Sequence, residues 1–298
     1  MKCERPMRKK SYPLHQCALY RCRTKKKLFE LLQTTPTKLA ELRSAPQLYR
    51  PKKKLKKDGT YRDVLAPRGD LKRIQKRISE LLLRVENPDY LMAPVRGRSN
   101  IDNAARHKGA RSFHLLDVED FYPRCSANKV ASFFSITLRC PPDVVKILLE
   151  LVTLNGALPA GSPASPSLAF WAYQDMWDEI SDIAHKAGCS LTLYVDDITV
   201  SGNLIPGNAI YSIKERLKHH GHSFKEKKEA SQIDGNVEVT GVILQPSGKV
   251  ALPNKHHKAM HQLRNQVRRL PEGPEKELQA ASLRGREINL RRILEQNI

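Results

Sequence analysis

The chain has 298 residues, of which 40% are hydrophobic and 28% charged, and its formal net charge at pH 7 is +21. This length permits a buried core, and the absence of an apolar run long enough for a signal peptide or a membrane span predicts a soluble protein without membrane contact. The six cysteines have no Cys-x-x-Cys spacing, which argues against a zinc site or disulfide framework and favours reduced thiols in the cytoplasm.

Helices and strands are predicted in mixed order along the chain. The helices are indicated by apolar residues at i, i+3 and i+4, and the strands by alternation of apolar and polar residues. Expected helices cover residues 70–85, 126–134, 142–154, 167–186, 208–221, 255–270 and 275–296, and expected strands cover 112–116, 191–195, 198–200 and 238–244. Because strands and helices do not alternate strictly, the pattern predicts an α+β fold rather than a doubly wound sheet.

Positive charge is concentrated at the two ends of the chain. Residues 1–62 carry 19 Lys or Arg against 4 acids, residues 63–248 carry 22 against 22, and residues 249–298 carry 11 against 5. Such ends predict that the chain grips a polyanion, because basic side chains neutralise phosphates and release counterions. Solubility or attraction to a membrane surface is the alternative explanation for this charge.

An aspartate pair follows an apolar strand in the segment Tyr194-Val195-Asp196-Asp197. Alternation on both sides predicts a hairpin with the two acids at or beside its bend. Two carboxylates about 4 Å apart repel by roughly 4 kcal/mol at an effective dielectric near 20, so they require metal ions or basic groups nearby. Magnesium suits such oxygen ligands, whereas a surface turn is the alternative for an isolated pair.

A third acid, Asp117, also ends an apolar strand. If the two strands are neighbours in one sheet, Asp117 meets Asp196. Two metal ions held by such carboxylates would activate an attacking hydroxyl and stabilise a leaving pyrophosphate. The three acids together therefore predict phosphoryl-transfer chemistry.

With these acids in order, the sequence resembles the palm of reverse transcriptases. Asp117–Tyr122 is similar to the first metal-binding motif of that family, Leu158–Pro166 to its LPQG-type loop, and Tyr194–Asp197 to its catalytic hairpin. Upstream, KKDGTYRDVLAPRGDLKRIQKRI resembles the fingers segment, and Gly221–Lys228 resembles the motif that carries a pyrophosphate-protonating lysine. Departures from the family pattern are Ala160 in place of Gln, Ala164 in place of Thr, Phe170 in place of Asn and Lys225 in place of Asn.

The resemblance implies a role for each matching residue. Two Mg²⁺ ions would be bound at Asp117, Val118, Asp196 and Asp197. Lys228, with the adjacent Lys227 as the alternative, would protonate pyrophosphate. The incoming deoxynucleotide would be bound by Lys57, Arg62, Val118, Tyr122 and Gly161, with Tyr122 as the gate that rejects a ribose 2′-hydroxyl.

Two further strings are similar to signatures of retron reverse transcriptases. They are Asn103-Ala104-Ala105-Arg106-His107 and Val239-Thr240-Gly241. Nucleic-acid contact is expected for two groups, the signature residues Asn103, His107, Thr240 and Gly241 and the helix residues Lys255, Lys258, Arg264 and Arg268. The alternatives are a structural histidine, a turn-capping asparagine and a solvated helix face. Thr240 and Gly241 are expected to shape a strand turn beside the primer, with Gly241 allowing close backbone approach.

The retron family implies a right-hand polymerase fold within the α+β class. The expected parts are basic N-terminal fingers over 1–110, a palm over 111–244 with fingers elements within 125–165, and a small helical thumb over 245–298. Expected partners are deoxynucleotides, a structured non-coding RNA that is template and primer, its DNA product, and an effector protein in antiphage defence. The alternatives are an intron-type or other palm polymerase, or a basic RNA-binding scaffold whose polymerase activity is dispensable.

Overall fold

The computed structural model describes residues 11–55 and 61–297. Residue contacts divide the chain into two compact units. Unit 1 comprises the chain up to Pro88, Pro94–Arg96 and Asp120–Asp178, and unit 2 comprises Asp89–Ala93, Gly97–Glu119 and the chain from Glu179 onward. The chain therefore passes between the units several times, and each unit contains its own sheet and helices.

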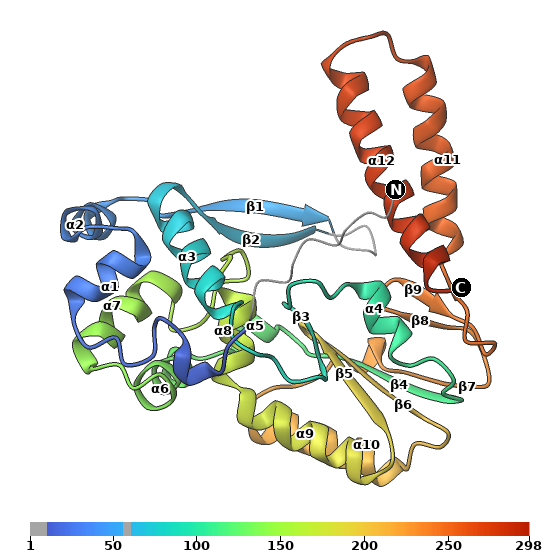
Figure 1. Ribbon diagram of the computed structural model, residues 1–298, viewed down its shortest axis with the longest axis horizontal. Coiled ribbons are helices and arrows are strands. Elements are labelled where there is room, and N and C mark those ends of the chain that lie inside the picture. Colours follow the sequence, from blue (N-terminus) through green and yellow to red (C-terminus); the bar gives the residue numbers. More distant parts are fainter. Residues whose placement is uncertain (1–10, 56–60, 298) are drawn as a thin grey trace. The chain divides into compact units, whose positions relative to one another are not determined.

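A five-stranded sheet forms the centre of unit 2 (Figure 1). Its strands, in spatial order, are β3 (Leu91–Ala93), β5 (Ser190–Tyr194), β6 (Asp197–Gly202), β4 (Ser112–Asp117) and β7 (Ala230–Ile233). Neighbours are antiparallel except for β3 and β5. Apolar side chains of the central strands fill the core, and Leu116, Ile198 and Val200 are at most 2% exposed. Helix α10 (Gly207–His219) adds the fully buried Ile213 and Leu217.

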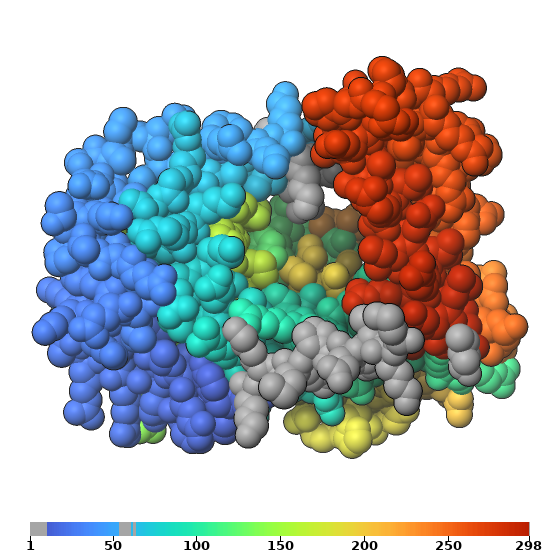
Figure 2. Space-filling model, turned by 45° about the horizontal axis from the view of Figure 1, so that its top comes forward, coloured from blue at the N-terminus to red at the C-terminus, as the bar shows by residue number. Residues whose placement is uncertain are grey.

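A smaller sheet in unit 2 supports a pair of long helices. Its strands β10 (Val250–Ala251), β9 (Val242–Leu244) and β8 (Val237–Val239) share a core with α4 (Asn100–Ala105), α11 (Asn254–Arg269) and α12 (Pro274–Glu295). Helices α11 and α12 run side by side (Figures 1 and 2), yet their only buried residues are Met260 and Ile293. The helical pair is therefore fixed at its base, and most of its surface is open to solvent.

Unit 1 is mainly helical and includes a two-stranded ribbon of β1 (Tyr49–Leu55) and β2 (Tyr61–Pro67). Its helices are α1 (Lys25–Leu32), α2 (Pro36–Ser44), α3 (Gly69–Leu82), α5 (Phe121–Arg124), α6 (Ala127–Ser132), α7 (Pro142–Val152) and α8 (Ser165–Ala172). Thr24, Thr35 and Ser126 cap α1, α2 and α6, because each side-chain oxygen accepts a backbone N–H from three residues on, at 3.2–3.3 Å. The helix predicted from residue 126 therefore begins where expected.

The helix predicted over 167–186 is instead two helices, α8 and α9 (Gln174–Lys186). Tyr173 interrupts it with φ −123° and ψ 25°. The Tyr173 hydroxyl accepts the N–H of Ser126 and donates to the carbonyl of Arg124, each at 3.1 Å. These distant contacts cannot be read from local periodicity, which explains the incorrect prediction.

The single strand predicted over 238–244 is instead the hairpin β8–β9. Thr240 and Gly241 form its turn with φ of 47° and 83°, the pattern of a two-residue type I′ turn. No heavy atom beyond its chain neighbours lies within 4 Å of a Cβ placed on Gly241. Gly241 is therefore suited to its positive φ, and its close backbone approach beside the primer stays a prediction.

The expected division into fingers, palm and thumb stays a prediction, since contacts group residues 111–119 and 120–178 in different units. The five cysteines of the described segments, namely Cys17, Cys22, Cys125, Cys140 and Cys189, are buried free thiols. No helix of the described segments has both the length and the apolar character needed to cross a bilayer.

Candidate active site

Two of the three predicted acids face each other at one end of the unit 2 sheet. Strand β4 ends at Asp117, β6 begins at Asp197, and the antiparallel register pairs these residues directly. Such partners have Cβ atoms about 4.5–5.5 Å apart on the same face, and like charges there repel. The pair therefore creates a concentrated negative charge that needs cations nearby.

The third acid, Asp196, lies in the turn between β5 and β6. Its carbonyl accepts the N–H of Val118 at 2.9 Å, which holds the turn beside the end of β4. The preceding residue, Val195, has φ 63°. Positive φ at the first turn position is typical of a type II′ turn, where Gly is usual, and costs a β-branched residue about 1–3 kcal/mol. The sheet therefore holds this turn in a strained conformation.

Two lysines neutralise Asp117. Lys225 Nζ donates to Asp117 Oδ1, and Lys228 Nζ donates to Oδ2 at 2.7 Å. Burial alone would raise the pKa of Asp117, but the hydrogen bonds and attraction from both lysines outweigh it and leave the pKa below its ordinary value. Asp117 is therefore an ionised carboxylate enclosed by positive charge.

The sequence predicts a role for only one of these two lysines. Lys228 contacts Asp117, and its role toward pyrophosphate, with Lys227 as the alternative, stays a prediction. Lys225 appeared in the sequence only as a departure from the family pattern. Its contact depends on pairing between the segments after β4 and before β7, where Val118 and Phe224 form an antiparallel bridge. A long-range pairing of this kind leaves no local sequence signal.

A second ionic cluster fixes the residue that follows Lys228. Glu229 Oε1 lies 2.6 Å from Lys214 Nζ and 2.9 Å from His114 Nε2, and all three side chains are less than 25% exposed. Lys214 also lies over the Phe224 ring, with Nζ 4.6 Å from its centroid. These contacts hold both ends of the segment 224–229. They therefore position Lys225 and Lys228 against Asp117.

The chemistry of the acids fits a divalent cation, although their present arrangement does not complete a site. Carboxylate oxygens are the ligands preferred by Mg²⁺. In the described segments, however, no three His, Cys, Asp or Glu side chains converge closely enough to hold an ion. Both Asp117 oxygens instead accept lysine N–H groups. A cation at Asp117 would therefore have to displace lysine hydrogen bonds.

The two short signature strings meet inside unit 2. Asn103 Nδ2 donates to Thr240 Oγ1 at 3.2 Å, and the Thr240 hydroxyl donates to the carbonyl of Asn100 at 3.3 Å. Asn100 Nδ2 in turn donates to the carbonyl of Thr240 at 3.2 Å. These bonds join α4 to the β8–β9 turn. Thr240 is therefore engaged in the fold, and its predicted contact with nucleic acid stays a prediction.

His107 is buried in the same region. It is 1% exposed, and its two ring nitrogens lie 2.7 Å from the hydroxyls of Ser201 on β6 and Thr192 on β5. Burial, with a smaller effect of Arg106, lowers the His107 pKa to about 4. A neutral ring, with one nitrogen donating and one accepting, suits both hydroxyls.

The burial of Asn103 and His107 contradicts their predicted contact with nucleic acid. Asn103 is 0% exposed, and His107 is enclosed by the sheet. Polar side chains at these positions satisfy hydrogen bonds between elements, which is the structural alternative that the sequence left open.

The predicted nucleotide-binding residues of unit 1 lie on its ribbon, loop and short helix α5. A Cβ on Gly161 would lie 2.3 Å from the carbonyl oxygen of Leu65, so glycine lets the loop pack directly on β2. Tyr122 is half-buried in α5, with its ring 5.6 Å from that of Phe121. The backbone of Arg62 pairs with Lys54, and Lys57 lies outside the described residues.

The predicted basic residues of α11 divide into two kinds. Lys255 pairs with Glu238 at 2.8 Å, and Arg264 pairs with Glu287 of α12 at 2.8 Å. Lys258 and Arg268 are exposed. All four side chains are exposed, and Lys255 and Arg264 also join α11 to β8 and α12.

Comparisons with known proteins show which proteins the chain resembles in sequence. The family model for reverse transcriptase (RNA-dependent DNA polymerase) matches residues 51–244. The chain is 35% identical over 148 residues to the retron Se72 reverse transcriptase of Salmonella heidelberg, covering 49% of this chain and 39% of that protein. It is also 29% identical over 141 residues to the retron Ec86 reverse transcriptase of Escherichia coli, a match that covers 47% of this chain and 44% of that protein. The matches thus span less than half the length of these relatives.

A solved structure is similar in fold. Apo telomerase from Candida tropicalis, truncated from the C-terminal domain, matches with a TM-score of 0.51 and 10% identity over 70% of this chain and 56% of that chain. At this identity the likeness concerns the fold alone. It agrees with the α+β polymerase fold expected from the sequence.

Replacement of Val195 by Gly should raise the free energy of unfolding by roughly 1 kcal/mol. The gain reflects release of strain at positive φ, partly offset by the greater unfolded-state entropy of Gly. Denaturant titration measures it. Leu191→Gly, in the ordinary strand conformation of β5, is the control and should lower stability. A decrease in the free energy of unfolding for Val195→Gly similar to that of the control would show that the turn is unstrained.

Acidification should destabilise the wild-type protein through His107. Its pKa is about 4 when folded and about 6.5 when unfolded, so the unfolded state binds more protons between these values. The free energy of unfolding is then highest above pH 6.5, and it decreases toward pH 4 by at most about 3 kcal/mol. Denaturant titrations of wild type and His107→Gln across this range measure the difference. Identical pH dependence in both proteins would contradict the buried neutral histidine.

Proposed function

The chain belongs to the reverse transcriptase family, and from this premise we propose that it is an RNA-directed DNA polymerase of retron type. The observation that carries the proposal is the direct pairing of Asp117 with Asp197, with Asp196 in the adjoining turn. The names of the relatives support the retron assignment over an intron-type enzyme.

Asp117, Asp196 and Asp197, with Val118 beside them, are proposed to hold two magnesium ions, which would activate the primer hydroxyl and stabilise the leaving pyrophosphate. Lys225 and Lys228 neutralise Asp117 in the free protein. Release from Asp117 would leave Lys228 available to donate its Nζ proton to pyrophosphate. The exposed side chain of Lys228, at 56% exposure, can make this movement more easily than Lys225, at 22%.

Residues of unit 1 are proposed to select and bind the deoxynucleotide. Tyr122 would exclude a ribose 2′-hydroxyl, while Arg62 and Lys57 would contact the triphosphate. Gly161 would act through its loop, whose close packing on β2 fixes the base of the ribbon. Positioning of this kind supplies much of the catalysis in phosphoryl transfer.

A structured non-coding RNA is proposed as template and primer, with RNA-linked single-stranded DNA as product. The basic α11–α12 pair supports this assignment, and its exposed Lys258 and Arg268 are the proposed phosphate contacts. Thr240 and Gly241, in the β8–β9 turn, are proposed to lie beside the nucleic acid. An effector protein, a cytoplasmic location and a role in antiphage defence complete the proposal, and these rest on the resemblance to retron enzymes.

Asp196→Asn should reduce RNA-templated DNA synthesis by about a thousandfold or more, because it removes a carboxylate from the reaction centre. Primer extension with deoxynucleotides and magnesium measures the loss, and circular dichroism checks folding. Asp234→Asn is the control, since Asp234 is an exposed acid paired with Arg111 in the same unit. Synthesis retained by folded Asp196→Asn would reject the assignment and leave an RNA-binding scaffold as the better explanation.

Tyr122→Ala should increase ribonucleotide incorporation relative to deoxynucleotides by about tenfold, because the ring no longer obstructs the 2′-hydroxyl. Single-nucleotide extension with each nucleotide gives the ratio of kcat/KM values. Tyr122→Phe keeps the ring and should discriminate like wild type. An unchanged ratio in Tyr122→Ala would exclude the gate.

A further inference from the structure

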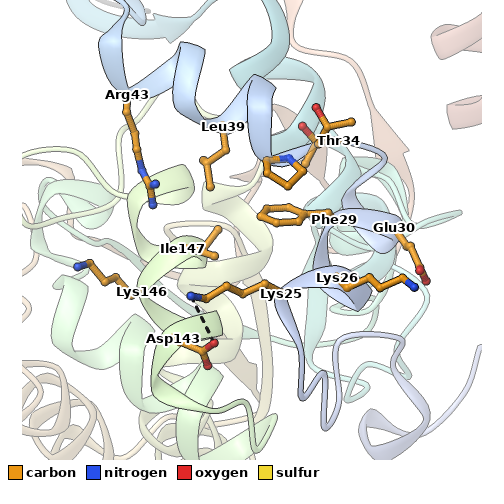
Figure 3. Close-up of a pocket in the computed structure, with 12 residues that line it drawn as sticks. Lys25, Lys26, Phe29, Glu30, Thr34, Leu39, Arg43, Asp143, Lys146 and Ile147 are labelled. Carbon is orange, nitrogen blue, oxygen red and sulfur yellow. Dashed lines mark ion pairs between the residues drawn. The ribbon is translucent and has the colours of Figure 1, made fainter.

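A hollow of about 770 Å³ lies in unit 1 between α1, α2 and α7 (Figure 3). Phe29, Leu39 and Ile147 provide apolar side chains from the three helices and point toward one another across its middle. Its size falls within the range of about 300–1,000 Å³ typical of ligand pockets. None of its lining residues belongs to the proposed active site.

Cationic side chains surround the apolar middle of this hollow. They come from α1 with Lys25 and Lys26, from α2 with Arg43 and from α7 with Lys146. Lys26 and Lys146 are exposed. The acids that also line the hollows are paired with other cations: Glu30 with Lys27, Asp143 with Lys25 and Glu150 with Arg43. The margin therefore offers two cations that an acidic ligand could neutralise.

Ion pairs join the helices at two points of the margin. Lys25 Nζ lies 3.8 Å from Asp143 and joins α1 to α7, while Arg43 lies 2.7 Å from Glu150 and joins α2 to α7.

A second hollow of about 500 Å³ continues the surface along α7. Val145 and Leu149 supply its apolar lining, and Lys146 borders both hollows. Helix α7 thus presents two apolar depressions with a cation between them. An amphipathic helix laid into a groove uses apolar anchors separated by polar residues in the same way.

We propose that this face of α7 binds an acidic amphipathic segment of a partner protein. Apolar side chains of the segment would occupy the two hollows, and its carboxylates would pair with Lys26 and Lys146. Single-stranded nucleic acid fits less well, because its bases bind mainly by stacking on aromatic rings and Phe29 is the only aromatic lining residue of either hollow.

Peptide display on the 298-residue chain tests this proposal. A library of random peptides of about 16 residues, enough for about four helical turns, is selected for binding to wild type. Counter-selection uses the double variant Lys26→Glu with Lys146→Glu. The matched control is Lys72→Glu with Lys76→Glu, which makes the same charge change at exposed positions of α3 outside both hollows. All four substitutions lie on the surface, so folding should persist.

The expected peptides are acidic and carry at least two apolar anchors on one face. Their affinity should be about tenfold or more lower for the Lys26/Lys146 variant than for wild type, and unchanged for the control variant. Failure to recover such peptides, or recovery of neutral or basic ones, would overturn the proposal. Single-stranded oligouridylate is titrated in parallel. A greater loss of its affinity in the Lys26/Lys146 variant than in the control would also overturn it, in favour of a nucleic-acid site.

Discussion

The arrangement of unit 2 depends on the antiparallel pairing of β4 with β6, which places Asp117 opposite Asp197. Hydrogen bonding between the strands fixes this register, so the two carboxylates cannot separate without disruption of the sheet. In the free protein, Lys225 and Lys228 reduce the repulsion between the two carboxylates, because both donate hydrogen bonds to Asp117. The same negative charge that the lysines neutralise is what a divalent cation would require.

Other contacts position the two lysines and the aspartates from outside the site. The Glu229 cluster anchors the lysine segment through Lys214 and His114, while the strained turn at Val195 keeps Asp196 next to the end of β4. Strain at Val195 costs about 1–3 kcal/mol of stability, whereas the ion pairs hold the segment that carries both lysines. The proposed catalysis depends on the geometry of the acids that these contacts maintain.

Much of this site could be predicted from the sequence, because the acids end strands with clear alternation. The strand at 112–116 and the hairpin at 191–200 were correct to within a residue or two, which fixes the place of Asp117 and Asp197. Motif order could not reveal the contact of Lys225, the burial of His107 or the break at Tyr173. Each depends on residues distant in sequence, as in the bonds of Tyr173 to residues 124 and 126 and of His107 to Thr192 and Ser201.

If the opposed aspartates bind divalent cations as proposed, the ions must compete with the two lysines that contact Asp117. Titration with Mn²⁺, followed by electron paramagnetic resonance of the free ion, measures this directly in wild type and Asp117→Asn. Wild type should bind Mn²⁺ saturably, and the affinity should fall by about tenfold or more in Asp117→Asn because a charged ligand is lost. Equal Mn²⁺ affinity in the two proteins would show that Asp117 is not a ligand.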